Sequence, residues 1–210
     1  MRIYPNEALR LYKDSNILTL GGLAHTIRTR LHPEKVITYI VDRNINYTNI
    51  CISGCKFCAF YRDKNAPDAY LLDLKTLKHK IEETIALGGR QILLQGGLHP
   101  DLPLEYYEDL LQKIKHHHPI WIHGFSPPEI MHISNTSKLT VKEVIARLIK
   151  AGLDSIPGGG AEILVDRVRD KISPLKCNSE QWLYVMETAH GLGLKTTATM
   201  MFGHIETVEE

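Results

Sequence analysis

The chain has 210 residues, of which 43% are hydrophobic and 23% are charged, and its formal net charge is +1 at pH 7. This composition is typical of a globular domain, and so balanced a charge gives no indication of a nucleic-acid or membrane partner. No apolar run reaches the roughly 18 residues of a membrane span, and residues 1–16 carry charges without the apolar stretch of a secretion signal. We therefore expect a cytoplasmic protein that binds neither nucleic acid nor membrane.

The first segment in chain order is a predicted helical preamble, residues 1–33, ahead of a core that comprises residues 34–210. Within the preamble, residues 5–31 follow a helical pattern, and we expect a break near Gly21 and Gly22. Pro33 cannot continue a helix, so it should end the preamble.

Strand-like apolar runs alternate with helical patterns through the rest of the chain. One helical pattern starts after Asp73 and places leucine and isoleucine at spacings of three and four. A second opens with a capping box at Thr140 and Glu143, and a third runs from Ser179 to a glycine stop at Gly193. The predicted strands cover residues 36–41, 91–95, 120–125, 153–157 and 195–202.

This alternation predicts an α/β fold with a parallel sheet, because a helix between two strands is the usual right-handed crossover of parallel strands. About five β/α units in a row favour a partial TIM-type (β/α) barrel, and a flavodoxin-like doubly wound sheet is the alternative. In such barrels the functional groups lie at the carboxyl ends of the strands. We therefore expect the site among the segments that directly follow the strands.

Residues 51–58, CISGCKFC, hold three of the four cysteines of the chain. In a reducing compartment such a cluster indicates metal or redox chemistry, and disulfides would leave one of the three thiols unpaired. A structural zinc site usually combines two separated ligand pairs, whereas three thiolates in one loop suit an iron–sulfur cubane with one iron left open. We favour the cluster and keep a zinc-binding structural module as the non-enzymatic alternative. Cys177 is interpreted as a lone thiol in a loop.

The spacing CxxxCxΦC, in which Φ is aromatic, resembles the signature of the radical S-adenosylmethionine superfamily. Cys51, Cys55, Phe57 and Cys58 match it at every position. The resemblance implies a 4Fe–4S cluster held by the three cysteines, with S-adenosylmethionine bound at the open iron. It also implies that Phe57 lies against the adenine of this cofactor, and that a one-electron donor such as flavodoxin or ferredoxin serves the cluster.

Further cofactor contacts implied by the resemblance follow later strands. Residues 95–97 correspond to a GGE-type segment of the family, although Leu98 replaces its acid, and glycines there permit a close backbone approach. Glu162, after PGGGA, stands where a carboxylate could hold the ribose or the methionine amine of the cofactor. Stabilisation of a helix N-terminus is the alternative for Glu162. The expected cofactor contacts are Phe57, Gln95, Gly96, Gly97, Ser126 and Glu162.

Longer stretches, among them VDRNINYTNICISGCKFCAFYRD, GFSPPEI, AGLDSIPGGGAEIL and TTATMMFG, resemble the radical enzymes of the futalosine route to menaquinone. RNINYTN and CAFYR favour the branch that cyclises dehypoxanthine futalosine, and aminofutalosine synthases and deazaflavin-forming relatives are the alternatives. The resemblance implies a small nucleoside substrate from whose ribose a hydrogen atom is removed. The general base is unassigned. Its candidates are His99, His123, Glu129 and His204, and for each of them a structural role is the favoured alternative.

The resemblance also sets an expectation about the end of the chain. Enzymes of this kind resemble barrels of six or more β/α units with a C-terminal extension, whereas the sequence HIETVEE closes the chain just after the fifth predicted strand. We therefore expect the sixth unit and the extension to be absent, which leaves an inactive fragment as a further alternative.

Overall fold

The computed structural model describes residues 3–210, and the contacts within it divide them into two units. One unit comprises the described residues up to Tyr39 together with Thr207–Glu210, and the other spans Ile40–Glu206. Within the described residues, no helix combines the length and the apolar character that crossing a membrane requires.

The first unit contains two helices, α1 (Pro5–Asp14) and α2 (Ile17–Leu31), so the helical pattern is confirmed. The break predicted at Gly21 and Gly22 is wrong, because both glycines lie inside α2. The helical segment is interrupted at Asn16 instead. The Asn16 side chain accepts a hydrogen bond from the backbone N–H of Thr19 at 2.9 Å and caps α2. A glycine inside a helix costs only about 1 kcal/mol, which a capped helix tolerates. Residues 1 and 2 of the predicted preamble lie outside the described residues.

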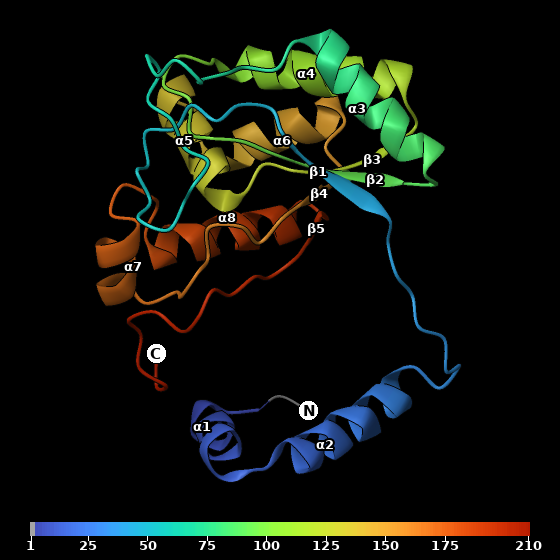
Figure 1. Ribbon diagram of the computed structural model, residues 1–210, viewed down its shortest axis with the longest axis vertical. Coiled ribbons are helices and arrows are strands. Elements are labelled where there is room, and N and C mark those ends of the chain that lie inside the picture. Colours follow the sequence, from blue (N-terminus) through green and yellow to red (C-terminus); the bar gives the residue numbers. More distant parts are fainter. Residues whose placement is uncertain (1–2) are drawn as a thin grey trace. The chain divides into compact units, whose positions relative to one another are not determined.

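The strands described in the second unit form one parallel sheet in the order β1-β2-β3-β4-β5. Neighbours in the chain are therefore neighbours in the sheet throughout (Figure 1), as in a β/α barrel. The predicted partial barrel is confirmed, and the flavodoxin-like alternative, whose strand order reverses, is wrong. The strands are β1 (Asp42–Asn46), β2 (Gln91–Gln95), β3 (Trp121–Gly124), β4 (Ser155–Ile156) and β5 (Lys195–Thr196).

The first strand lies later in the chain than predicted. Residues 36–41 are the more apolar run, but Val36, Ile37 and Tyr39 are exposed and belong to no strand. Pairing with β2 starts at Asp42↔Gln91, because the chain that precedes Gln91 turns through Gly88 with a φ of 82°. A strand needs a partner, and the segment before residue 41 has none in the described sheet. The prediction at 91–95 is confirmed, and the other three strands are shorter than predicted.

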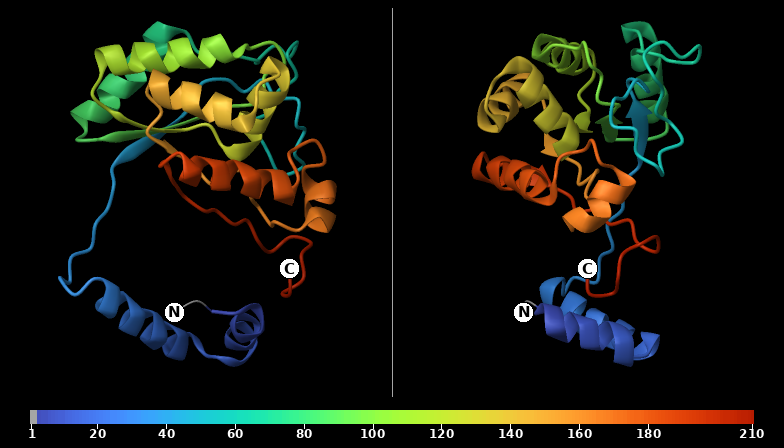
Figure 2. Two further views of the ribbon diagram at one scale, coloured as in Figure 1. Left: turned by 180° about the vertical axis from the view of Figure 1, so that it is seen from behind. Right: turned by 90° about the vertical axis from the view of Figure 1, so that its left-hand side faces the viewer.

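Helices connect the strands and cover the outer side of the sheet. In the right-hand view of Figure 2, α3, α4, α6 and α8 follow one another in an arc around the strands. The predicted caps at Asp73 and at Thr140 with Glu143 are present. The helices α5 and α7 were not predicted. The helices of this unit are α3 (Leu74–Ala86), α4 (Leu104–His117), α5 (Pro127–Ser137), α6 (Val141–Ala151), α7 (Asp166–Ile172) and α8 (Ser179–Gly191).

The main hydrophobic core lies between the sheet and these helices. It includes a set of edge-to-face aromatic rings, Tyr47, Tyr107 and Phe125, with ring centroids 5.5 to 6.0 Å apart. Ile92, Leu94 and Ile122 in the strands are fully buried, as expected where helices cover a parallel sheet. The packed core holds the strands in place, so the loops that follow their carboxyl ends start from a rigid rim.

Candidate functional site

The cysteine loop is fastened to the carboxyl ends of β1 and β2. The Tyr47 N–H donates to the Gln95 carbonyl at 3.3 Å, and the Gly97 N–H donates to the Thr48 carbonyl at 3.1 Å. Further along, the Ile52 N–H donates to the carbonyl of Leu98 at 3.1 Å. The two segments thus continue side by side beyond their strands, which places residues 51–58 next to residues 95–98.

This pairing explains the two glycines after β2. A Cβ atom on Gly96 would lie 2.6 Å from the Tyr47 ring, and one on Gly97 would lie 2.1 Å from the carbonyl oxygen of Ile50. Neither distance is compatible with a side chain. Gly96 leaves room for the Tyr47 ring, and Gly97 lets the start of the cysteine loop approach β2 this closely. The sequence predicted a close backbone approach at these glycines, and the structure places the cysteine loop itself there.

The three loop cysteines line one cavity of about 210 Å³ at this rim. Their thiols are free; Cys55 is buried, and Cys51 and Cys58 are half-buried. The Cys51 sulfur accepts two backbone N–H groups, from Ser53 at 3.4 Å and from Leu98 at 3.2 Å. The remaining lining residues are Asn46, Thr48, Asn49, Ser53, Phe57, Phe60, Tyr61, Tyr70, Gln95, Gly96, Gly97, Leu98, Ser126, Pro128, Glu129, Gly159, Gly160 and Lys176.

The donor set of this cavity fits an iron–sulfur cluster. Backbone N–H groups on a cysteine sulfur stabilise a thiolate ligand, and Cys51 has two of them. The hydroxyl of Ser53 is buried with no hydrogen-bond partner in the described chain, so a bound group can satisfy it. Among residues 3–210, no three His, Cys, Asp or Glu side chains are arranged around a single metal ion. A cubane spreads its ligands over several irons, and three thiols around one cavity are compatible with it.

Glu129, predicted as a candidate base, ties three strand ends together. Its carboxylate is buried and accepts hydrogen bonds from the Tyr47 hydroxyl at 2.8 Å and the Gly96 N–H at 3.0 Å. It also accepts the Ser126 N–H at 2.8 Å and the Ser126 hydroxyl at 2.6 Å. Burial raises the pKa of Glu129, and these hydrogen bonds oppose the rise. Four donors fill both oxygens, so the geometry is that of a brace across the rim.

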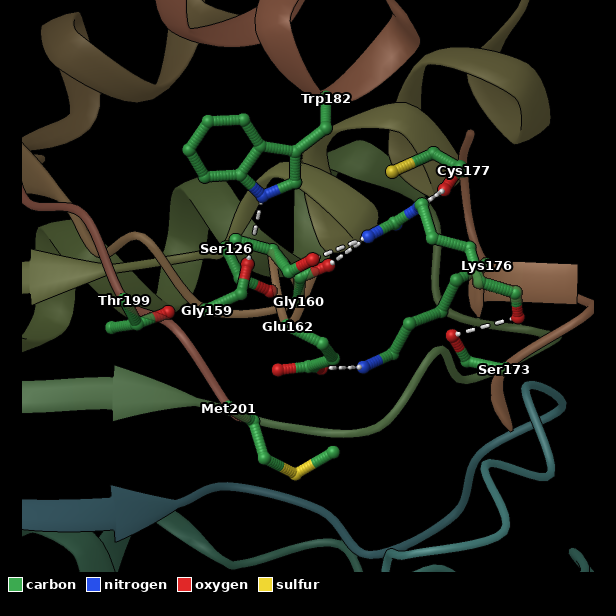
Figure 3. Close-up of polar contacts among 12 residues, drawn as sticks. Ser126, Gly159, Gly160, Glu162, Ser173, Lys176, Cys177, Trp182, Thr199 and Met201 are labelled. Atoms are coloured by element: carbon green, nitrogen blue, oxygen red, sulfur yellow. Dashed lines mark hydrogen bonds and ion pairs between the residues drawn. The ribbon is translucent and has the colours of Figure 1, made fainter. Parts of the chain in front are cut away.

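Lys176, which lines the cavity next to Phe57, forms an ion pair with Glu162, a predicted cofactor contact that is not among the described lining residues. Lys176 and Glu162 meet with Nζ and Oε1 2.9 Å apart, and both side chains are largely buried (Figure 3). The Lys176 ammonium also lies 5.2 Å from the centre of the Phe57 ring. Burial lowers the pKa of Lys176, but the charges of Glu162 and Cys55 outweigh it and the net shift is upward. Glu162 has a φ of 46°, an uncommon conformation for a residue with a side chain.

A buried arginine holds the two loops that carry this ion pair. The Arg169 guanidinium donates to the carbonyls of Gly160 at 3.0 Å and Ala161 at 2.6 Å. It donates also to the carbonyl of Cys177 at 3.2 and 2.5 Å. In the same region the Trp182 indole N–H donates to the Gly159 carbonyl at 3.2 Å (Figure 3). These contacts fix the loop after β4 against the segment that contains Lys176.

The three candidate histidines lie outside the lining of the cavity. His123 is in β3, with Nδ1 2.7 Å from the Ser155 hydroxyl, and burial lowers its pKa. His99 accepts the N–H of Asp101 at 3.1 Å, and burial lowers its pKa as well. His204 is 3.1 Å from a carboxylate oxygen of Glu206. Of the candidate bases, the structure therefore brings only Glu129 to the cavity.

Three residues that shape the site, Tyr47, Arg169 and Lys176, were not predicted from the sequence. No local pattern marks them, because each acts on segments that are distant in the chain. One missed signal was readable: Ser126 is followed by two prolines and then Glu129, which is a helix start with a capping box. That signal would have predicted α5 and the position of Glu129 at its first turn.

The fold itself has known counterparts. The chain aligns with HydG, a maturase of the FeFe-hydrogenase, at a TM-score of 0.73 over 98% of this chain and 45% of that one, with 17% identity. Methylornithine synthase (PylB) aligns at a TM-score of 0.67 over 93% of this chain and 55% of that one, with 15% identity. At such identities the likeness shows the fold alone.

A β/α-barrel sheet with three free thiols on one loop at its carboxyl rim is the arrangement expected of an iron–sulfur protein with a cluster held by that loop. The model of the Radical SAM superfamily matches residues 45–210. The chain therefore belongs to the Radical SAM superfamily, whose cofactors are a 4Fe–4S cluster and S-adenosylmethionine. This finding confirms the family predicted from the spacing of the cysteines.

Relatives of this chain include enzymes of two kinds. Cyclic dehypoxanthine futalosine synthases from Halalkalibacterium halodurans and Streptomyces coelicolor are 45% and 46% identical over all of this chain and 57% and 53% of their own lengths. A 5-amino-6-(D-ribitylamino)uracil–L-tyrosine 4-hydroxyphenyl transferase from Thermosynechococcus vestitus is 47% identical over 87% of this chain and 49% of its own. The chain thus spans about half the length of these curated relatives.

Proposed function

We propose that this chain provides the radical-generating domain of an enzyme that cyclises dehypoxanthine futalosine in menaquinone biosynthesis. The observation that carries the proposal is the similarity to two cyclic dehypoxanthine futalosine synthases over the whole chain, at 45% and 46% identity. The cavity beside the cysteine loop supports it, because it collects the thiols, the two close-approach glycines and an aromatic side chain at one rim. The cytoplasm, where clustered thiols stay reduced, is the proposed compartment.

In this proposal the chain's own residues bind and orient the cofactors. Cys51, Cys55 and Cys58 hold the cluster, and Phe57 with the Gly96–Gly97 backbone lines the place of S-adenosylmethionine. When bound, this cofactor pair supplies a 5′-deoxyadenosyl radical that can remove a hydrogen atom from a carbon. The buried Glu129 keeps three strand ends in register, so the cofactor-facing groups hold their positions.

The wall of the cavity suits a small aromatic nucleoside. Phe60, Tyr61 and Tyr70 add aromatic surface next to the cysteine loop, and the amides of Asn46 and Gln95 offer hydrogen bonds. Such a mixed lining can hold a ring system and a sugar while it keeps water away from a reactive carbon. A one-electron donor of the flavodoxin or ferredoxin class is the proposed partner.

A second candidate function is the transfer of a 4-hydroxyphenyl group from tyrosine to 5-amino-6-(D-ribitylamino)uracil. The observation that favours it is the 47% identity to enzymes of that name over 87% and 82% of this chain. The cysteine loop and its glycine neighbours serve both reactions equally, since both begin with the same cofactors. The two candidate functions can therefore be distinguished only by the substrate that the enzyme converts.

The test is a substrate comparison under anaerobic conditions. The cluster-reconstituted enzyme is chemically reduced in the presence of S-adenosylmethionine and given dehypoxanthine futalosine, the ribitylaminouracil with tyrosine, or an enolpyruvyl-benzoate ether in separate reactions. Products are separated by liquid chromatography with mass detection. We expect a product with two hydrogen atoms fewer than dehypoxanthine futalosine. A Cys58→Ala variant is the control and should form no product in any of the three reactions. Turnover of tyrosine and the uracil alone would overturn the proposal in favour of the transferase, and turnover of an enolpyruvyl-benzoate ether alone would favour aminofutalosine synthase.

A further inference from the structure

Lys176 brings positive charge into the cavity of the cysteine loop. Of the described residues that line this cavity, it is the one with a cationic side chain. Its side chain is only 15% exposed, which is uncommon for lysine, because burying an ammonium group is costly without a partner. The burial of a lysine in the same cavity as three thiols therefore calls for a functional explanation.

Two contacts fix the position of the ammonium group. Glu162 provides a carboxylate oxygen 2.9 Å from Nζ, and its own side chain is 12% exposed. Phe57 presents its ring face with the ring centre 5.2 Å from Nζ, which is within the range of a cation–π interaction. Phe57 lies two residues after Cys55 in the same loop, so this contact joins Lys176 to the cysteine loop directly.

Lys176 lines the same cavity as the three loop thiols, of which Cys55 is the most buried. Its ammonium group is therefore held at the wall of the cavity in which a cluster ligated by these thiols would lie. Because the side chain is largely buried, solvent screens its charge less than it would on the surface.

We propose that Lys176 is a positioning residue for the iron–sulfur cluster, held by Glu162 and Phe57 so that its positive charge lies at the wall of the cavity shared by the three loop thiols and raises the reduction potential of the cluster. The inference rests on the proposed assignment of Cys51, Cys55 and Cys58 as cluster ligands. Reduction adds one negative charge to the cluster, so a nearby cation stabilises the reduced form. The partner carboxylate of Glu162 works in the opposite direction and moderates the effect.

The test is a potentiometric titration of the anaerobically reconstituted protein without S-adenosylmethionine, followed by electron paramagnetic resonance. Lys176→Met should shift the midpoint potential of the cluster downward, and Glu162→Gln should shift it upward, because each removes a charge of opposite sign. Lys176→Arg should stay near the wild-type potential. Lys150→Met, on the exposed face of α6, is the matched control and should leave the potential unchanged.

The outcomes separate this inference from the proposed function. If iron and sulfide analysis finds no 4Fe–4S cluster in the wild-type protein, the proposed function itself fails. If the cluster forms and Lys176→Met and Glu162→Gln leave its potential unchanged or shift it in the same direction, the role of Lys176 is refuted. Should Lys176→Met fail to retain iron, Glu162→Gln still decides, since an unchanged or lowered potential there overturns the inference.

Discussion

Replacing Gly97 by alanine tests whether the approach of the cysteine loop to β2 builds the site. The new Cβ atom would lie 2.1 Å from the Ile50 carbonyl oxygen and 2.7 Å from the Cys51 Cβ atom. Ordinary Cβ contacts are no shorter than 3.0 Å, so the Ile50 backbone has to withdraw by about 0.9 Å. Because Ile50 directly precedes Cys51, this movement displaces the first thiol of the loop.

Two quantities follow from that displacement. Overpacking of this kind costs about 1–3 kcal/mol of unfolding free energy, and for a chain of this size each kcal/mol lowers Tm by about 2–4 °C. The affinity for iron should fall about 10-fold or more, since moving a ligand and its supporting N–H groups has effects of that order on metal sites. Thermal unfolding of the apoprotein measures the first, and iron retention against a chelator measures the second.

Gly191→Ala is the matched control for this experiment. Gly191 ends α8, and a Cβ atom there would meet nothing within 4 Å. Its Tm should stay at the wild-type value or rise, because alanine is the better helix former by about 1 kcal/mol. The reasoning is refuted if Gly97→Ala matches wild type in both Tm and iron retention.

Three further predictions concern the cluster ligands and the two buried braces. Changing any one of the loop cysteines to alanine should abolish binding of the complete cluster, whereas the Cys177→Ala variant should retain its iron. If the Cys177→Ala variant lost as much iron as the loop-cysteine variants, a cluster held by the loop alone would be contradicted. Glu129→Gln should lower the free energy of unfolding by about 1–3 kcal/mol, because the amide leaves buried donors unpaired. Burial raises the pKa of Glu129 in the folded state, so the stability that this carboxyl contributes is present below its unfolded pKa of about 4.3 and is lost as pH rises through the folded pKa. In urea unfolding, the difference in unfolding free energy between wild type and Glu129→Gln should therefore narrow with rising pH. A difference that widens would contradict this reasoning. Arg169→Lys should lower stability by about 1–3 kcal/mol and weaken the binding of S-adenosylmethionine in calorimetry, because lysine cannot reach all the carbonyls that the guanidinium holds; wild-type values for both would exclude the bracing role.

Local sequence signals predicted most of the helices and the type of fold. Asp73 and the Thr140–Glu143 pair act on backbone groups within three residues, so the helix starts they mark can be read without the rest of the molecule. The first strand could not be placed in this way. Residues 36–41 are the more apolar run, but DRNIN at 42–46 is the segment that meets β2, and pairing depends on both partners.

The sequence alone determined the chemistry of this protein, because the cysteine spacing and the aromatic residue before the last cysteine are properties of eight consecutive residues. Only the tertiary structure decided which distant groups surround those thiols. Gly97 is required because the Ile50 carbonyl lies against it. Lys176 matters because it lies beside Glu162 and Phe57, which precede it in the chain by 14 and 119 positions. Steric contact acts over a few ångströms and charge over about 10 Å in physiological salt, and both act through space. Their effect is therefore fixed by the folded arrangement and leaves no periodic signal in the sequence.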